Sequence, residues 1–440
     1  MIAPQRRREI IDALRRGTVP QRGLDALAVG TDRFADTILD ELDAVAGGAG
    51  GFKAVRGEWG SGKTFTVRWI AERARSRGFA TAEVQISEGE TPLHHLETVY
   101  RRLCERLTTS DTPTGGALRA IVDSWFFALH EDVVSSGAAR PDDRDAIVDA
   151  TTDLAEQRLG EVAQRAPALA AVLRGYRRAL AAGDDATAEG LLAWLAGQPH
   201  VAASIKRSAG LRGDLDHDGA LGFLAGLLTI LRGAGYAGLV LILDEVETLQ
   251  RIRSDSRDRA LNALRQLIDE VDQGRFPGLY LVITGTPAFF DGPQGAKRLP
   301  PLAQRLHTDF TTDARFDNPR AVQLRLAGFD LAALGEVGRR VRDLYASGSE
   351  RAADIERLAD DSYVDLLAAA VTGDLGGQVG IAPRLFLKKL VGDVLDRIDQ
   401  FPAFDPRRDY GLTVVDGELS EIERNARAAA NVDEIDLDLP

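Results

Sequence analysis

The sequence has few residues of the kinds that build disulfide bonds and metal sites. Cys104 is the single cysteine among 440 residues, so no disulfide can form within the chain and no cysteine-based metal site is expected. This usage fits a reducing compartment, and we expect a cytoplasmic protein. The six histidines include the adjacent pair His94 and His95, but neighbouring residues on a helix do not share a face. The sequence therefore predicts no zinc site, and Cys104 is expected to be a packing residue.

Long apolar runs are also missing. No stretch approaches the roughly 18–20 apolar residues of a membrane span, and the basic N-terminal residues are not followed by the apolar segment of a secretory signal. The net charge of −13 argues against a chain-wide electrostatic attraction to DNA, although a local basic patch stays open. A length of 440 residues is enough for two or three globular domains.

A glycine-rich motif typical of nucleotide phosphate loops occupies residues 57–64. It is preceded by a strand-like run at 52–56 and followed by a helical pattern at 65–76. Glycines let the backbone wrap a phosphate, and the amino end of the following helix adds N–H groups and a partial positive charge. We therefore expect Lys63 to reach the β- and γ-phosphates of ATP, and Thr64 to bind Mg²⁺. The predicted nucleotide-binding residues are Gly57, Glu58, Trp59, Gly60, Ser61, Gly62, Lys63 and Thr64. The alternative is a chance Gly-rich turn before Lys-Thr, which the flanking strand and helix disfavour.

A second motif follows a run of apolar residues. Residues 239–243 are apolar without alternation, as expected for a strand buried on both faces of a parallel sheet, and Asp244 and Glu245 come next. The carboxyl ends of such strands form the ligand edge of an open α/β sheet. Asp244 is thus predicted to hold Mg²⁺ together with Thr64, and Glu245 to polarise the water that attacks the γ-phosphorus. Taken alone, the pattern could equally be a buried strand that ends at two solvated acids. A pure nucleotide-binding switch would not need Glu245, so its presence favours hydrolysis.

Further candidates lie outside these two motifs. Another apolar strand pattern at 279–283 leads to Thr284 and Thr286, and Thr284 is our first choice to sense the γ-phosphate or the attacking water. The alternative is a Thr-Gly-Thr turn that satisfies its own backbone. Arg384, at the start of a C-terminal helix, and Arg305, shortly after the third buried strand, are candidate arginines for stabilising phosphoryl transfer. For each arginine, a surface salt bridge is the alternative.

The segment just before the phosphate-loop region supplies two more candidates. We expect Val29 and Gly30 to contact the adenine base, Val29 through its apolar side chain and Gly30 through its backbone. An equally good interpretation is a simple helix N-cap at Thr31 or Asp32.

Composition and periodicity divide the chain into five parts. Almost no strand pattern occurs between residues 92 and 232, where helical periods recur, and helical patterns return after residue 330. The predicted parts are an N-terminal helical segment and adenine-side connector at 1–50, an ATPase core at 51–91 and 233–328, a helical insertion at 92–232, a C-terminal helical lid domain at 329–430, and an acidic flexible tail at 431–440.

The order of these motifs resembles the AAA+ branch of P-loop ATPases. More narrowly, the chain resembles the BrxD-type ATP-binding proteins of bacterial BREX antiphage systems over most of its length. The segments that carry this resemblance are residues 7–20, 54–64, 82–87, 243–249 and 284–287. The resemblance implies an α/β P-loop NTPase fold, AAA+-like, with a parallel sheet, a large helical insertion and a C-terminal helical lid domain. It also implies a role in phage defence with BREX partners such as a helicase or a methyltransferase.

Two functions remain in view at this point. The leading hypothesis is an Mg-dependent ATPase that acts as a motor or switch in a protein–DNA assembly. The alternative is a nucleotide-gated scaffold or signalling ATPase with negligible turnover. A small-molecule kinase is disfavoured because no motif for a second substrate pocket is present. Oligomeric state and direct DNA contact through the Arg-rich stretches 157–178 and 251–265 stay open.

Overall fold

The computed structural model describes residues 2–140, 142–374, 383–415, 417, 419 and 424. The tail predicted at 431–440 lies outside the described residues. Two compact units make up the chain, and each is described by itself. The first unit consists of Met1–Asp36, Val55–Glu72 and Asp309–Pro440, and the second of Thr37–Ala54 and Arg73–Thr308. In the part of the chain that the structure describes, none of the helices is both long and apolar enough for a membrane crossing.

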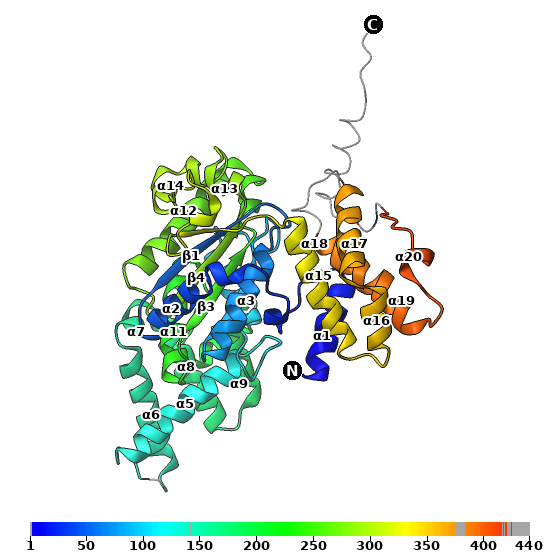
Figure 1. The fold of residues 1–440 in the computed structure, drawn as a ribbon. Coiled ribbons are helices and arrows are strands. Elements are labelled where there is room, and N and C mark those ends of the chain that lie inside the picture. The colour runs from blue at the N-terminus through cyan, green and yellow to red at the C-terminus, as the bar shows by residue number, and fades with distance from the viewer. Residues whose placement is uncertain are drawn as a thin grey trace. The chain divides into compact units, whose positions relative to one another are not determined.

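A five-stranded sheet confirms the α/β class (Figure 1). Its strands lie in the order β2-β3-β4-β1-β5. Their bounds are β1 Gly51–Arg56, β2 Ala80–Gln85, β3 Leu239–Asp244, β4 Leu279–Gly285 and β5 Gln323–Arg325. β3 pairs in parallel with β2 and with β4. Every residue of β3 and β4 is buried, which explains why their sequences are apolar without alternation.

The register of the pairs brings the carboxyl ends of three strands in the second unit to one edge. Gln85, the last residue of β2, lies opposite Asp244, the last residue of β3. Leu243 lies opposite Ile283 of β4. Consequently Thr284, the next residue of β4, is level with Asp244, and the polar side chains of Gln85, Asp244 and Thr284 end up at the same edge.

Strand β1 carries a buried lysine that needs a partner. Lys53 is only 1% exposed, and its Nζ forms an ion pair with Glu41 of α2 (Ala35–Ala46) at 2.6 Å. The Tyr280 hydroxyl of β4 donates to the same carboxylate at 2.5 Å. Gly51 allows this approach, since a Cβ there would lie 2.6 Å from the Tyr280 ring. The cluster satisfies a charge that would otherwise be costly to bury.

A set of helices connects β2 to β3 within the second unit. Their bounds are α4 Leu96–Arg106, α5 Leu118–Ser135, α6 Arg144–Leu159, α7 Glu161–Arg165, α8 Pro167–Ala181, α9 Asp185–Leu195, α10 Ala203–Ser208 and α11 His217–Gly233. Contacts join α5 to α6 and α11, and α8 to α6 and α9, and Figure 1 shows these helices gathered beside the sheet. Asp143, Asp184 and Asp216 accept from backbone N–H groups as N-caps of α6, α9 and α11. Trp194 and Phe223 pack edge to face with ring centroids 5.6 Å apart.

Three more helices of the second unit follow β3 in the sequence. They are α12 Ser254–Asp272, α13 Pro287–Asp291 and α14 Pro300–Arg305.

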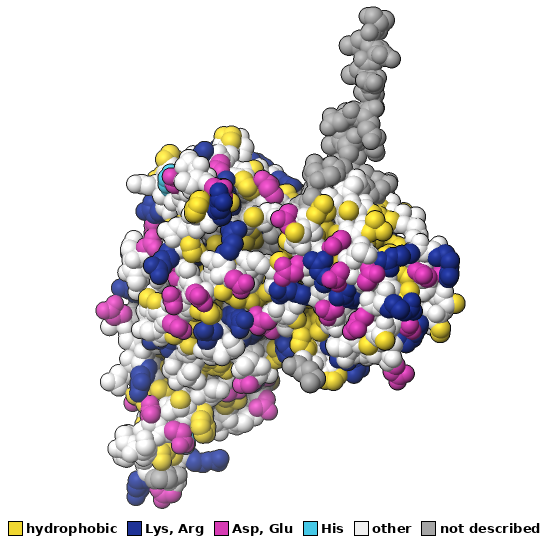
Figure 2. Space-filling view, viewed as in Figure 1, with side chains coloured by type: hydrophobic (Ala, Val, Ile, Leu, Met, Phe, Trp, Pro, Cys, Tyr) yellow, Lys and Arg dark blue, Asp and Glu magenta, His cyan; other side chains and the backbone are white. Residues whose placement is uncertain are grey.

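On the face drawn in Figure 2, basic and acidic side chains are interspersed, and the described residues of that face form no broad patch of one charge.

The first unit joins residues from both ends of the sequence in one hydrophobic core. Besides most of α3 (Lys63–Ser76), its helices include α1 Pro4–Arg15, α15 Leu331–Ala346, α16 Ala352–Leu358, α17 Asp361–Asp374, α18 Pro383–Lys389, a π-helical segment Leu390–Leu395, α19 Asp396–Gln400 and α20 Pro406–Asp409. Ile10 and Leu14 of α1 belong to the same buried cluster as Val341 and Phe386. Arg15 adds two hydrogen bonds to the Asp396 carboxylate, at 2.6 and 2.8 Å. Helix α1 is therefore packed onto the C-terminal helices, a contact that sequence periodicity does not indicate.

Candidate active site

The phosphate-loop motif forms a tight turn between β1 and α3 (Lys63–Ser76) in the first unit. Gly60 and Gly62 have φ values of 79° and 90°, in the left-handed region that favours glycine. Gly57 is buried, and a Cβ there would lie 2.2 Å from Ser61 Oγ, so a larger residue would collide with the loop. Residues 57–62 thus need their glycines for both conformation and space.

Lys63 lies across this turn. Its ammonium group donates to the carbonyl oxygens of Gly57 at 2.9 Å and Glu58 at 3.3 Å, and it lies 5.0 Å from the centre of the Trp59 ring. Ser61 Oγ is buried and has no hydrogen-bond partner among the residues that the structure describes. A lysine at the loop, an unsatisfied hydroxyl and the amino end of a 14-residue helix fit a phosphate group. Thr64, the second residue of α3, is half-buried beside them.

The acidic motif belongs to the second unit. Asp244 ends β3 and is buried, at 5% exposure. Thr284 is fully buried, and its hydroxyl donates to Asp244 Oδ1 at 2.5 Å and accepts from the Glu245 N–H at 2.9 Å. Thr284 therefore connects the two predicted acids rather than closing its own turn. Thr286, the second choice, is buried at the start of α13 and makes no side-chain cap there.

Glu245 has an unusual backbone conformation. Its φ of 61° and ψ of 44° place it in the left-handed region, where non-glycine residues are uncommon. Its N–H donates to the Thr284 hydroxyl. Its carbonyl oxygen accepts from the Thr248 N–H at 3.0 Å and from the Thr248 hydroxyl at 2.9 Å. Gln85 Nε2 donates to the Glu245 carboxylate at 2.8 Å. These contacts hold both the strained backbone and the side chain, as is typical of functional positions.

Sequence reasoning missed Gln85 and Thr248. A signal for Gln85 exists, because it is the polar residue that ends β2, just as Asp244 ends β3 and Thr284 follows the apolar run of β4. Thr248 has no comparable signal, since its hydroxyl contacts depend on the short 3-10 turn Val246–Gln250 after Glu245.

The two candidate arginines have different surroundings. Arg305, in the second unit, forms an ion pair with Asp269 through Nε, and its Nη1 donates to the Pro301 carbonyl at 2.8 Å. Arg305 thus forms a salt bridge, as the alternative interpretation of this residue expects. Arg384, in the first unit, is exposed on α18, and its Nη1 lies 3.4 Å from the position that a Cβ on Gly17 would take.

Val29 and Gly30 lie in the first unit, as does the phosphate loop. Arg340 of α15 donates to the carbonyl of the preceding residue, Ala28, and Val29 packs against the hydrophobic core of this unit. Gly30 has a φ of 72° and precedes a 3-10 turn at Thr31–Arg33, which has no side-chain cap. A Cβ added at Gly30 would have no heavy atom of the described residues within 4 Å, apart from its neighbours in the chain.

A further residue near the loop was not predicted. Phe329 packs against the core of the first unit, and its Cε2 lies 3.6 Å from the position that a Cβ on Gly62 would take. The phosphate loop and the C-terminal helices of the first unit are therefore connected through an aromatic side chain. A single aromatic residue after β5 carries no local signal for this contact.

The structure thus brings Asp244, Glu245 and Thr284 together in the second unit, and it groups the phosphate loop with Val29, Gly30 and Arg384 in the first. No curated protein and no solved structure matches the chain. The family model described as BREX system ATP-binding protein BrxC/D matches residues 2–414. Because that match covers most of the sequence, the chain belongs to the family of BREX system ATP-binding proteins BrxC/D.

Proposed function

We propose that this protein is a P-loop, AAA+-like ATPase that hydrolyses Mg-ATP and acts as a motor or switch in a BREX defence assembly. The observation that carries the hydrolytic part is the Thr284 hydroxyl, which joins Asp244 to the backbone of Glu245. A site that only bound nucleotide would not need a second carboxylate held in a strained backbone conformation and oriented by Gln85.

The proposed roles follow from the chemistry of each group. The loop of residues 57–64 holds the phosphates through backbone N–H groups, and Lys63 exchanges its loop carbonyl contacts for phosphate oxygens. Thr64 and Asp244 would supply oxygen ligands for Mg²⁺, which would neutralise charge on the phosphates when bound. Glu245 accepts a proton from the attacking water, and Thr284 keeps the two acids in place.

Partners are proposed from the family alone. As a BREX ATP-binding protein, the chain is expected to act with other components of such a system. A helicase or a methyltransferase of that system, DNA contacted directly or through partners, and a second copy of this chain are the proposed partners. The alternative function is a nucleotide-gated scaffold without turnover, which predicts tight ATP binding and no product release.

The proposal is tested by comparing ATP binding with ATP turnover in three variants. Glu245→Gln should bind ATP like the parent and lose at least about 100-fold in turnover, the usual scale for a missing general base. Lys63→Ala should weaken ATP binding itself. Glu90→Gln, an exposed glutamate on the loop after β2, is the matched control and should behave like the parent. Turnover at the parental rate in Glu245→Gln would remove the assigned role.

A further inference from the structure

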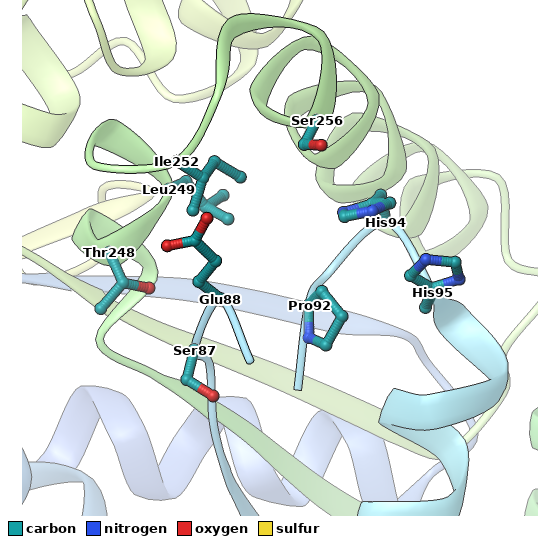
Figure 3. Close-up of a pocket in the computed structure, with 9 residues that line it drawn as sticks. All are labelled: Ser87, Glu88, Pro92, His94, His95, Thr248, Leu249, Ile252 and Ser256. Carbon is teal, nitrogen blue, oxygen red and sulfur yellow. The ribbon is translucent and has the colours of Figure 1, made fainter. Parts of the chain in front are cut away.

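A small pocket lies beside the catalytic edge of the second unit and is not part of the predicted nucleotide site (Figure 3). Its walls come from the loop after β2 and from the segment that follows Glu245, and they include Glu88, Pro92, His94, Leu249 and Ile252. Its volume of about 250 Å³ is below the roughly 300–1,000 Å³ of pockets for drug-sized ligands. The space suits a single side chain rather than a nucleotide or a cofactor.

The pocket contains one carboxylate without a partner. Figure 3 shows the Glu88 carboxylate beside Leu249 and Ile252, with Pro92 and His94 on the opposite side of the pocket. Within the described part of the chain, no residue forms a hydrogen bond or an ion pair with the Glu88 carboxylate. The next glutamate of the same loop, Glu90, lies 3.8 Å from Arg102 in an ion pair. Glu88 is therefore available to a ligand.

Aromatic and apolar groups complete the pocket. The rings of His94 and His95 lie against each other, with centroids 4.4 Å apart. Burial, together with the nearby His95 and Arg259, lowers the pKa of His94 and so favours the neutral form of its ring. Arg259 is itself paired with Asp255 at 3.6 Å, so Glu88 is the unpaired charge of the pocket. A carboxylate, a neutral ring and an apolar wall together complement a planar cation on an aliphatic stem.

We propose that this pocket receives an arginine side chain presented by a partner protein. The methylene stem would pack on Pro92, Leu249 and Ile252, and the guanidinium would pair with Glu88 and stack on His94. Arginine is favoured over lysine because its planar, delocalised guanidinium both stacks on rings and binds carboxylates through two N–H groups. Charge complementarity selects this partner chemistry, since an acidic or phosphorylated segment would meet the unpaired Glu88.

The position of the pocket connects such a contact to the proposed catalytic edge. Thr248 lines the pocket, and its hydroxyl contacts the carbonyl oxygens of Glu245 at 2.9 Å and Ile86 at 3.2 Å. Ser87, another wall residue, directly follows Ile86. Thr248 would thus connect an arginine in the pocket to the backbone of Glu245.

The experiment is a titration of the full chain with Nα-acetyl-arginine methylamide, followed through the imidazole resonances of protein labelled at histidine. Six histidines give a simple spectrum, and single His94→Gln and His95→Gln variants assign the two resonances of the pocket. The matched ligand is Nα-acetyl-citrulline methylamide, which has nearly the same shape and no charge. The matched variants are Glu88→Gln and Glu90→Gln, both at exposed positions where loss of folding is not expected.

The arginine derivative should shift the His94 and His95 resonances in a saturable way, and the citrulline derivative should bind about tenfold more weakly or worse. Glu88→Gln should weaken arginine binding about tenfold, the scale of one charge-assisted hydrogen bond, while Glu90→Gln should leave it unchanged. Equal shifts with citrulline, parental affinity in Glu88→Gln, or shifts confined to the other four histidines would overturn the proposal. Because the readout does not involve ATP, its failure is distinguishable from failure of the ATPase assignment.

Discussion

Replacing Thr284 by valine tests the connection between the two acids most directly. Valine has nearly the same shape as threonine and fits the fully buried site, but it lacks the hydroxyl. Two hydrogen bonds are lost at once, one to the Asp244 carboxylate and one from the Glu245 N–H. The change therefore removes a polar bridge without creating a cavity.

The expected cost follows from what the lost hydroxyl leaves behind. A buried donor or acceptor that loses its partner costs roughly 1–3 kcal/mol, and more when the group is charged. Asp244 is buried and Glu245 is half-buried, so we expect the free energy of unfolding to fall by about 2–4 kcal/mol. The control is Thr284→Ser, which keeps the hydroxyl and loses one methyl group, at a cost of about 1 kcal/mol.

Two measurements check this expectation. Urea unfolding should show a larger loss of stability for the valine variant than for the serine variant. Hydrogen exchange should show faster exchange of the Glu245 amide in Thr284→Val only, because that N–H loses its acceptor. If ATP is hydrolysed as proposed, turnover should also fall far more in the valine variant. A serine variant as damaged as the valine variant, or an equally protected Glu245 amide in both, would refute the bridging role.

Two further predictions concern groups outside the proposed site. Burial raises the pKa of Cys104 to about 12. The native protein should therefore react with iodoacetamide at pH 8 far more slowly than a free cysteine does, and unfolding in urea should restore the rate. Fast alkylation of the folded protein would contradict this expectation. Hydrogen bonds from Ser362, Arg407 and the Tyr363 N–H lower the pKa of Asp360 from 3.8 to about 2. The stability that Asp360 contributes should therefore be complete above pH 4 and disappear as the pH falls toward 2. The melting temperatures of the parent and of Asp360→Asn should converge over that range. A constant difference between the two melting temperatures would show that ionisation of Asp360 is not the source of the stability.

Local patterns in the sequence were sufficient for the α/β class. The apolar runs that became β3 and β4 are buried at every residue, and that burial is what removes the alternation of polar and apolar positions. The glycines of the phosphate loop could also be recognised locally, because their backbone angles depend on their own residue type. Such features involve residues within a few positions of one another, so a sequence displays them directly.

The arginines show where local reasoning stops. Arg305 looked like a candidate for catalysis, yet its guanidinium pairs with Asp269, which lies 36 residues earlier on α12. No nearby residue in the sequence distinguishes an arginine with such a partner from one that is available to a ligand. The same limit applies to Glu88 and Glu90, two neighbouring exposed glutamates of which only one has a basic partner.

Residue types and their short-range spacing were thus enough to name strands β1, β3 and β4, the loop glycines and the two acids, since each depends on the preferences of a short segment. The contacts that give these residues their proposed roles required the folded chain. Thr284 reaches Asp244 across 40 residues, Gln85 reaches Glu245 across 160, and Arg15 reaches Asp396 across 381. Pairings over such distances arise when strand register and core packing bring remote segments together, and a linear pattern contains no record of that register.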